Sequence, residues 1–209
     1  KALESYRASL AIREALGDAP GMALLFNNLG AVYARQEHWE GARQAWAKCL
    51  ALHEGVGDHA GQAITLGNLG SLAQRQGQWP QALSWYERSL RLYRETGDAL
   101  GEATIHNNVG FVQKQLGDLG KALAAYQEAL KLLHQIGDSL RATVTMYNMA
   151  MIHEDQGNFR EALRLLEQVI ELDRRTGHPD LRRDLETFRR VRQKLDAGRD
   201  AKRMQEERA

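Results

Sequence analysis

The residues best suited to catalysis or metal binding are scattered along this sequence instead of lying at spacings that build a site. The seven histidines show neither an HExxH pattern nor clustered metal-ligand spacing, and His153-Glu154-Asp155 is an isolated trio. The single cysteine, Cys49, falls among small packing residues, and no Gly-x-Ser-x-Gly nucleophile motif occurs. The sequence therefore predicts a protein that is not an enzyme and holds no cofactor or metal.

One short stretch, Gly117 to Ala122, contains a Gly-Lys pair of the kind found in phosphate-binding loops. Such a loop also needs a glycine five residues before Gly120, where Gln115 stands, and Ser or Thr in place of Ala122. Nucleotide binding is therefore not expected here.

The charge balance indicates which partners to exclude. The chain has 28 Lys and Arg against 27 Asp and Glu, whereas nucleic acids and anionic membranes select clustered positive charge. No apolar run approaches 18 residues, and the first residues lack the layout of a signal peptide. We expect no nucleic-acid partner, no membrane partner and a cytoplasmic location, with which a single cysteine agrees.

A Gly-Asp dipeptide recurs every 40 residues. It occurs as Gly17-Asp18, Gly57-Asp58, Gly97-Asp98 and Gly137-Asp138, with Gly177-His178 in the same register. Apolar residues in each 40-residue repeat fall at helical spacing in two blocks, so each repeat is expected to form two helices. The glycine would end the second helix and the aspartate would cap the next one. Where three repeats have a glycine between the two blocks, the first has Glu37, whose left-handed conformation would cost about 1 kcal/mol.

Three columns of residues hardly change from repeat to repeat. They are an alanine column (Ala2, Ala42, Ala82, Ala122, Ala162), a bulky column (Tyr6, Trp46, Tyr86, Tyr126, Leu166) and a small column (Gly30, Gly70, Gly110, Ala150). Small residues that face large rings let two helices approach closely, so these columns predict packing within each helix pair.

This pattern resembles the tetratricopeptide repeat (TPR). The matching residues are Leu29-Gly30, Tyr33, Ala42 and Trp46; Leu69-Gly70, Ala82 and Tyr86; Val109-Gly110, Ala122 and Tyr126; and Met149-Ala150, Ala162 and Leu166. The period is 40 instead of about 34, and Gly-Asp replaces the closing proline. The longer form is similar to the repeats of kinesin light chains, spindle-orientation adaptors and bacterial multidomain signalling proteins. The resemblance implies an all-α, right-handed superhelix (an α-solenoid) of antiparallel helix pairs with a C-terminal capping helix.

The register divides the chain into six parts. These are 1–16, the second helix of an incomplete repeat; the repeats 17–56, 57–96, 97–136 and 137–176; and 177–209, a capping helix with a polar tail. Because residues 1–16 lack their partner helix, we expect the chain to be an excerpt of a longer protein. Leu181, Leu185, Phe188 and Leu195 form the apolar stripe of the capping helix, and residues 198–209 are expected to be frayed.

The resemblance also implies that the first helix of each pair lines a concave wall. The candidate peptide-binding residues there are Asn27, Asn28, Arg35, Asn68, Arg75, Asn107, Asn108, Phe111, Lys114, Tyr147, Asn148, Met151, Glu154 and Asp155. Leu24, Ile64, Thr104 and Val144 occupy positions on the same wall. The first row offers Asn27 and Ala31 without a lysine, which disfavours a clamp for chaperone C-termini.

Each class of candidate has an alternative interpretation. The asparagines can donate to and accept from a peptide backbone, or they can bond to neighbouring helices. Arg35, Arg75 and Lys114 would make the early groove basic, and Glu154 with Asp155 its late end acidic, or these can be solvated helix ends. Apolar groups on a groove wall, namely Phe111, Tyr147 and Met151, indicate an interaction site or contact between adjacent repeats.

The favoured function is a protein-interaction scaffold that binds a peptide segment, from another protein or from the parent chain, in the groove. The alternative is a sensor or regulatory arm of a larger signalling protein, carrying an ATPase, cyclase or transcription regulator, that acts by intramolecular docking. Single-stranded RNA would need a continuous basic groove, which Glu154 and Asp155 interrupt. Oligomerisation through the open N-terminal face is also compatible with the sequence.

Overall fold

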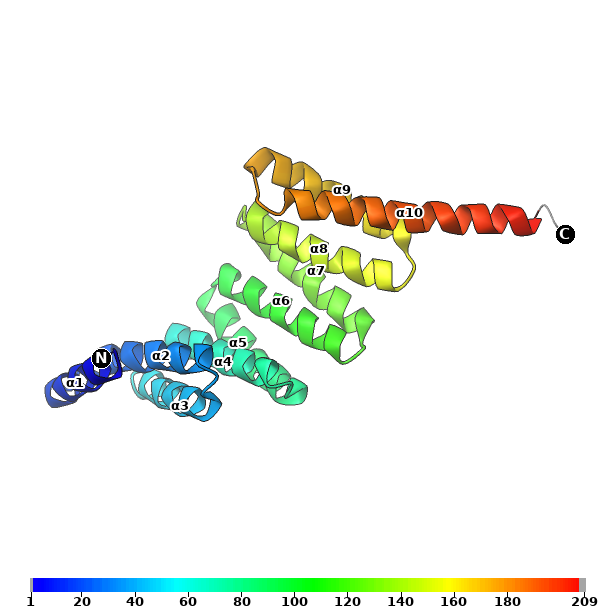
Figure 1. Ribbon diagram of the computed structural model, residues 1–209. Helices are drawn as coiled ribbons and strands as arrows, with labels where there is room; N and C mark the ends of the chain where they lie inside the picture. Colours follow the sequence, from blue (N-terminus) through cyan, green and yellow to red (C-terminus); the bar gives the residue numbers. More distant parts are fainter. Residues whose placement is uncertain (1, 207–209) are drawn as a thin grey trace. The chain divides into compact units, whose positions relative to one another are not determined.

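The computed structural model of the protein describes residues 2–206 and, within them, the side chains of residues 6 and 9–199. This part of the chain consists of ten α-helices without a strand (Figure 1). The helices fall into two compact units, Lys1–Leu116 and Gly117–Ala209, here called unit 1 and unit 2. The predicted all-α architecture of antiparallel helix pairs is confirmed.

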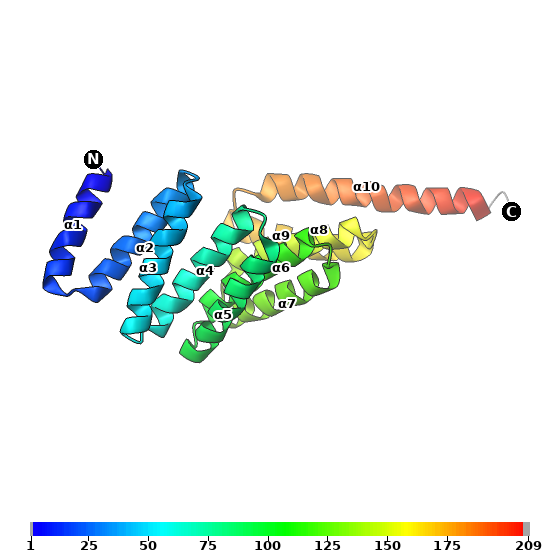
Figure 2. The same ribbon diagram turned by 90° about the horizontal axis from the view of Figure 1, so that it is seen from below.

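Unit 1 contains six helices and unit 2 contains four. In unit 1 they are α1 (Ala2–Leu16), α2 (Ala19–Arg35), α3 (Trp39–Gly55), α4 (His59–Arg75), α5 (Trp79–Thr96) and α6 (Ala99–Gln115). In unit 2 they are α7 (Leu119–Gln135), α8 (Ser139–Asp155), α9 (Phe159–Thr176) and α10 (Leu181–Glu206). The even-numbered helices α2, α4, α6 and α8 are the first helices of the repeats, and α3, α5, α7 and α9 are the second helices (Figures 1 and 2).

Each first helix of a repeat begins at an aspartate, as the sequence predicts. Asp18 accepts from the backbone N–H of Gly21 at 2.9 Å, and Asp98 accepts from that of Gly101 at 2.8 Å. Asp58 and Asp138 cap their helices in the same way, which satisfies donors that a helix start leaves unpaired.

The turns between helices depend on the left-handed backbone conformation. Gly97 has φ 71° at the end of α5. Glu37, with φ 57°, is the one non-glycine residue with positive φ in the described part of the chain, as its place in the repeat predicts. Pro80 lies in the first turn of α5, where its missing N–H costs no helical bond.

Within a helix pair, the small column faces the bulky column. A Cβ at position 30 would lie 2.6 Å from the ring of Trp46, and one at position 70 would lie 2.5 Å from the ring of Tyr86. Tyr86 is fully buried, as is the column alanine Ala82. The predicted packing of a column glycine against the facing aromatic ring, here called the interlock, is therefore present in these two pairs. The side chain of Ala2, the first member of the alanine column, lies outside the described part.

In unit 2, α10 packs on α9 and extends beyond it (Figure 1). The predicted stripe of Leu181, Leu185, Phe188 and Leu195 is half-buried, and Val191 is fully buried beside it. The expectation of a frayed segment from residue 198 is corrected, because α10 continues to Glu206. Residues 207–209 lie outside the described part.

The variant Gly70→Val tests whether the close approach of the two helices depends on a glycine at this position. The larger side chain would enter the volume of the Tyr86 ring, and overpacking of a filled core typically costs about 1–3 kcal/mol. We expect urea denaturation to show a loss of about 2 kcal/mol in the free energy of unfolding.

Gly55→Val is the matched control, because a Cβ at position 55 would have no neighbouring atom within 4 Å. Its effect should stay within about 0.5 kcal/mol. Equal losses in the two variants would show that the glycine column does not set the distance between the helices.

Candidate functional site

The exposed side of the first helices in unit 1 is the principal candidate surface, here called the first-helix face. Its residues recur three or four apart on each helix, a spacing that places them on one side. They are Leu24, Asn28, Ala31 and Arg35 on α2; Ile64, Asn68, Ser71 and Arg75 on α4; and Thr104, Asn108, Phe111 and Gln115 on α6.

Three large apolar side chains stand out on this face. Leu24 is 58% exposed, Ile64 48% and Phe111 40%. The Phe111 ring meets the Trp79 ring edge-on, with centroids 6.4 Å apart, so one edge is held while the rest faces solvent. Leu24 and Ile64 were expected on this wall but were not singled out as binding residues; the signal is that both are large, apolar and 40 residues apart.

The asparagines divide into structural and exposed members. Asn27 Oδ1 accepts from Asn68 Nδ2 at 2.9 Å and from Trp46 Nε1 at 3.2 Å, so it joins α2 to both α4 and α3. Asn107 Nδ2 donates to a carbonyl of its own helix at 3.4 Å. Among the four predicted ladder residues, Asn28 is exposed, and Asn68, Asn108 and Asn148 are half-buried. The structural interpretation therefore holds for Asn27 and Asn68.

The three basic residues predicted for the early groove, Arg35, Arg75 and Lys114, also differ in their contacts and exposure. Arg75 Nη1 donates to the backbone carbonyl of Ala34 at 2.9 Å, and its guanidinium lies 4.9 Å from the centroid of the Trp39 ring. Arg75 thus satisfies a carbonyl at the end of α2. Arg35 is exposed, and Lys114 is half-buried.

In unit 2, α10 lies against the side of α8 that carries Tyr147, Met151 and Glu154. The hydroxyl of Tyr147 lies 3.4 Å from Thr187 Oγ1, and the guanidinium of Arg183 lies 4.7 Å from the centroid of the Tyr147 ring. Met151 Sδ accepts from Arg190 Nη2 at 3.8 Å. Both predicted contact residues are therefore partly enclosed by a helix of the same unit.

Glu154 is the most strongly held residue of this interface. It is 8% exposed and accepts from Arg190 Nη2 at 2.7 Å and from Lys194 Nζ at 2.8 Å. Burial alone would raise the pKa of its carboxyl, but the hydrogen bonds from Lys194 and Arg190 outweigh that effect and lower the pKa. Asp155 is exposed, as is Val144.

These contacts correct part of the sequence-based prediction. The sequence offered two interpretations for Tyr147, Met151 and Glu154, either the wall of a groove with an acidic late end, or contact between neighbouring elements and a solvated helix end. All three residues lie against α10, and Arg183, Arg190 and Lys194 on that helix supply the opposite charge.

A buried pair of carboxyl groups lies between α9 and α10. Asp173 is 1% exposed and Asp184 2%, and neither side-chain oxygen of Asp173 has a hydrogen-bond partner. Burial, the neighbouring Asp184 and then Asp180 raise the pKa of Asp173 to about 6, against an opposing effect of His178, whose Nδ1 lies 3.9 Å from Asp173 Oδ1. We therefore expect the stability of the α9–α10 interface to depend on the protonation of Asp173.

Metal clusters and membrane-spanning helices are absent from the described part of the chain. No three His, Cys, Asp or Glu side chains in this part are arranged to hold a metal ion. None of the described helices has both the length and the apolar character needed to cross a bilayer.

Stacked helix pairs with interlocking glycines and aromatic rings define the class of α-helical repeat proteins. The sequence profile of the tetratricopeptide repeat matches residues 21–95 and 101–175, which together make up more than half of the sequence. The chain belongs to the tetratricopeptide repeat family. No curated protein matches the sequence.

Solved structures show the same fold at low sequence identity. BtubC (BKLC) from P. vanneervenii aligns with a TM-score of 0.82 and 20% identity, over 92% of this chain and 82% of that one. RapI in its apo form gives 0.76 and 17%, over 84% and 64%. The TPR-like repeats of a putative kinesin light chain from Podosopora anserina give 0.70 and 16%, over 88% and 93%. At these identities the likeness concerns the fold alone.

Because the Asp173 carboxyl is buried beside Asp184, we expect the effect of Asp173→Asn on protein stability to depend on pH. Because the pKa of Asp173 is raised from 3.8 to about 6, its contribution to stability is fully present below about pH 4 and is lost as the pH rises through 6. A neutral amide avoids that loss, so the variant should be more stable than the wild type at pH 7.5, by up to about 3 kcal/mol.

Thermal unfolding at pH 4 and pH 7.5 measures this difference. The advantage of the variant should shrink toward pH 4, whereas Gln193→Ala, an exposed change in the same unit of a side chain that does not titrate, should show no such trend. An Asp173→Asn variant that is less stable than the wild type at pH 7.5 would contradict the assignment.

Proposed function

We propose that this protein is an interaction scaffold that binds a peptide segment across the first-helix face of unit 1. Repeats of this family generally mediate protein–protein interactions. The observation that carries the proposal is the exposure of Leu24, Ile64 and Phe111 on three successive first helices. Exposed apolar groups with a polar surround are typical of interaction sites.

In this proposal, the polar residues of the first-helix face set the orientation of the bound peptide and contribute less to its affinity. The exposed amide of Asn28 can donate to and accept from a partner backbone. Arg35 is exposed at the end of α2 and suits an acidic side chain of the partner. Asn27, Asn68 and Arg75 would act indirectly, by holding α2 and α4 in place.

A regulatory arm is the second candidate function. It is favoured by α10, which docks a helix of the chain on α8 through charged side chains. In this role the docked helix would be exchanged for a partner or released by a ligand. The two candidates differ in where a partner would act, since the scaffold uses unit 1 and the regulatory arm uses the α8–α10 contact.

Phe111→Ala tests the scaffold proposal. Peptides selected by display on the immobilised wild-type protein would be titrated against each variant by fluorescence anisotropy. Removal of the ring should weaken binding by at least 1 kcal/mol, roughly a fivefold increase in Kd, because central aromatic residues dominate interface energies. Far-UV circular dichroism should show unchanged helicity.

Ile136→Ala is the matched control, because Ile136 is 43% exposed but lies at the end of α7 in unit 2. It should leave the affinity unchanged. Selected peptides that bind Phe111→Ala and wild type equally well would remove Phe111 from the proposed site.

A further inference from the structure

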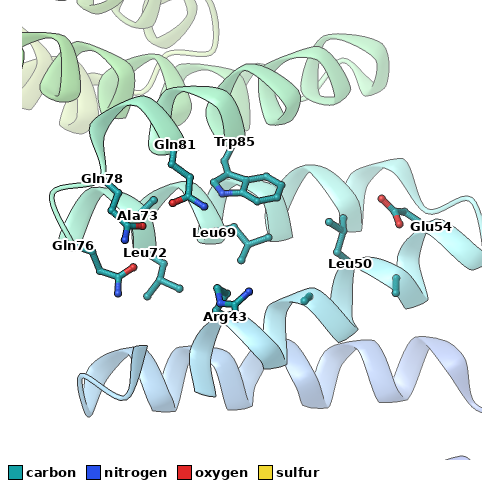
Figure 3. A pocket seen from close by; sticks show the side chains of 12 residues that line it. Arg43, Leu50, Glu54, Leu69, Leu72, Ala73, Gln76, Gln78, Gln81 and Trp85 are labelled. Carbon is teal, nitrogen blue, oxygen red and sulfur yellow. The ribbon is translucent and has the colours of Figure 1, made fainter. Parts of the chain in front are cut away.

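A second surface feature of unit 1 lies between the second helices α3 and α5, above α4. It is a hollow of 230 Å³ whose apolar lining includes Ala47, Leu50, Ala51, Leu69, Leu72 and Trp85. Figure 3 shows Trp85 at one wall, with Leu69 and Leu72 on the floor and Leu50 on α3. None of these residues belongs to the first-helix face.

The repeat register shows how the sequence opens this hollow. In three columns of the repeat, the residues that line the hollow differ from those of the other complete repeats. The first repeat has Ala47 where the other complete repeats have Glu87, Gln127 and Glu167, and Ala51 where they have Arg91, Lys131 and Glu171; the incomplete repeat also has an alanine, Ala11, in the second of these columns. The second repeat has Trp85 where the others have Ala45, Ala125 and Leu165. Two long polar side chains are absent from one wall, and a large ring is added to the other.

The floor of the hollow is formed by closely packed apolar side chains. Leu50, Leu69 and Leu72 are 8%, 5% and 4% exposed and belong to one packed cluster. Trp85 packs against this cluster while remaining half-buried, and the guanidinium of Arg88 lies 4.9 Å from the centroid of its ring. A side chain placed in the hollow would therefore contact a preformed surface, which limits the entropy cost of binding.

The two ends of the hollow differ in polarity. At one end Glu54 has a 51% exposed side chain, and its ion pair with Arg88 is long, at 3.9 Å, so its carboxylate is weakly compensated. At the other end lie the exposed amides of Gln76 and Gln78, and Arg43, whose guanidinium already donates to Glu40 at 2.7 and 3.0 Å. There the hollow adjoins a second one, of 310 Å³, which shares Arg43, Gln76 and Gln78 and reaches Trp39.

We propose that this hollow docks a short segment of a second, different protein by a single bulky apolar side chain, such as Leu, Met or Phe. Charge complementarity sets the direction of the segment. A basic residue on one side of the anchor pairs with Glu54, and an amide or hydroxyl residue on the other side bonds to Gln76 and Gln78. Glu54 and Arg43 are 11 residues apart on α3, about 16 Å, which a segment of five or six extended residues spans.

The test is a peptide-display selection on the wild-type protein with counter-selection on the double variant Ala47→Glu/Ala51→Arg. The variant restores residues that the equivalent positions of another repeat carry at exposed helical sites, so unit 1 should keep its fold. The single variant Ala51→Arg serves as a milder alternative if the double variant loses helicity. We expect the surviving peptides to share one apolar anchor, with a basic residue on one side and an amide or hydroxyl residue on the other.

Affinities of these peptides separate the hollow from the first-helix face. They should bind Ala47→Glu/Ala51→Arg at least tenfold more weakly than wild type and should bind Ala31→Glu, a change on the first-helix face, equally well. Loss of binding to Ala31→Glu alone would overturn the proposal and would assign those peptides to the first-helix face. Failure to recover any peptide that distinguishes the double variant from wild type would also overturn it.

Discussion

Contact between successive repeats, made by the second helix of one on the first helix of the next and by bonds between their first helices, is the interaction on which this structure depends. The bonded residues are separated by close to one period: Asn27 and Asn68 by 41 positions, Arg75 and Ala34 by 41, and Glu154 and Lys194 by 40. A single helix pair cannot bury its apolar surface alone, so a repeat protein is stable only through such neighbours. The same contact decides which residues remain available to a partner.

The contrast between the two units follows from this constraint. In unit 1, the bonds of Asn27 and Arg75 join α2 to α4 and leave Leu24 and Ile64 exposed. In unit 2, α10 takes the place of a next first helix although it keeps none of the repeated columns. Its arginines and lysine bond to Met151 and Glu154, while Val144, the α8 equivalent of Leu24 and Ile64, stays exposed. Charge pairs therefore join α10 to α8, whereas an amide pair and an arginine–carbonyl bond join α2 to α4.

Much of the fold is predictable because its determinants are local. The 40-residue period, the aspartate caps, the left-handed Glu37 and the facing of Gly70 by Tyr86 all follow from residues close in sequence or fixed by the register. The candidate site was less predictable. The burial of Glu154 depends on residues of α10 that belong to no repeated column, and the α3–α5 hollow arises from side chains that are missing.

Hydroxyl-radical footprinting tests most directly whether the following helix decides the availability of first-helix residues. We predict slow oxidation of Met151 in the wild type and faster oxidation in an Arg190→Ala/Lys194→Ala variant, which loses the bonds from α10 to Met151 and Glu154. Oxidation of Phe111, which is 40% exposed in unit 1, should be the same in both proteins. Oxidation of Met151 at the same rate in the two proteins would contradict the account.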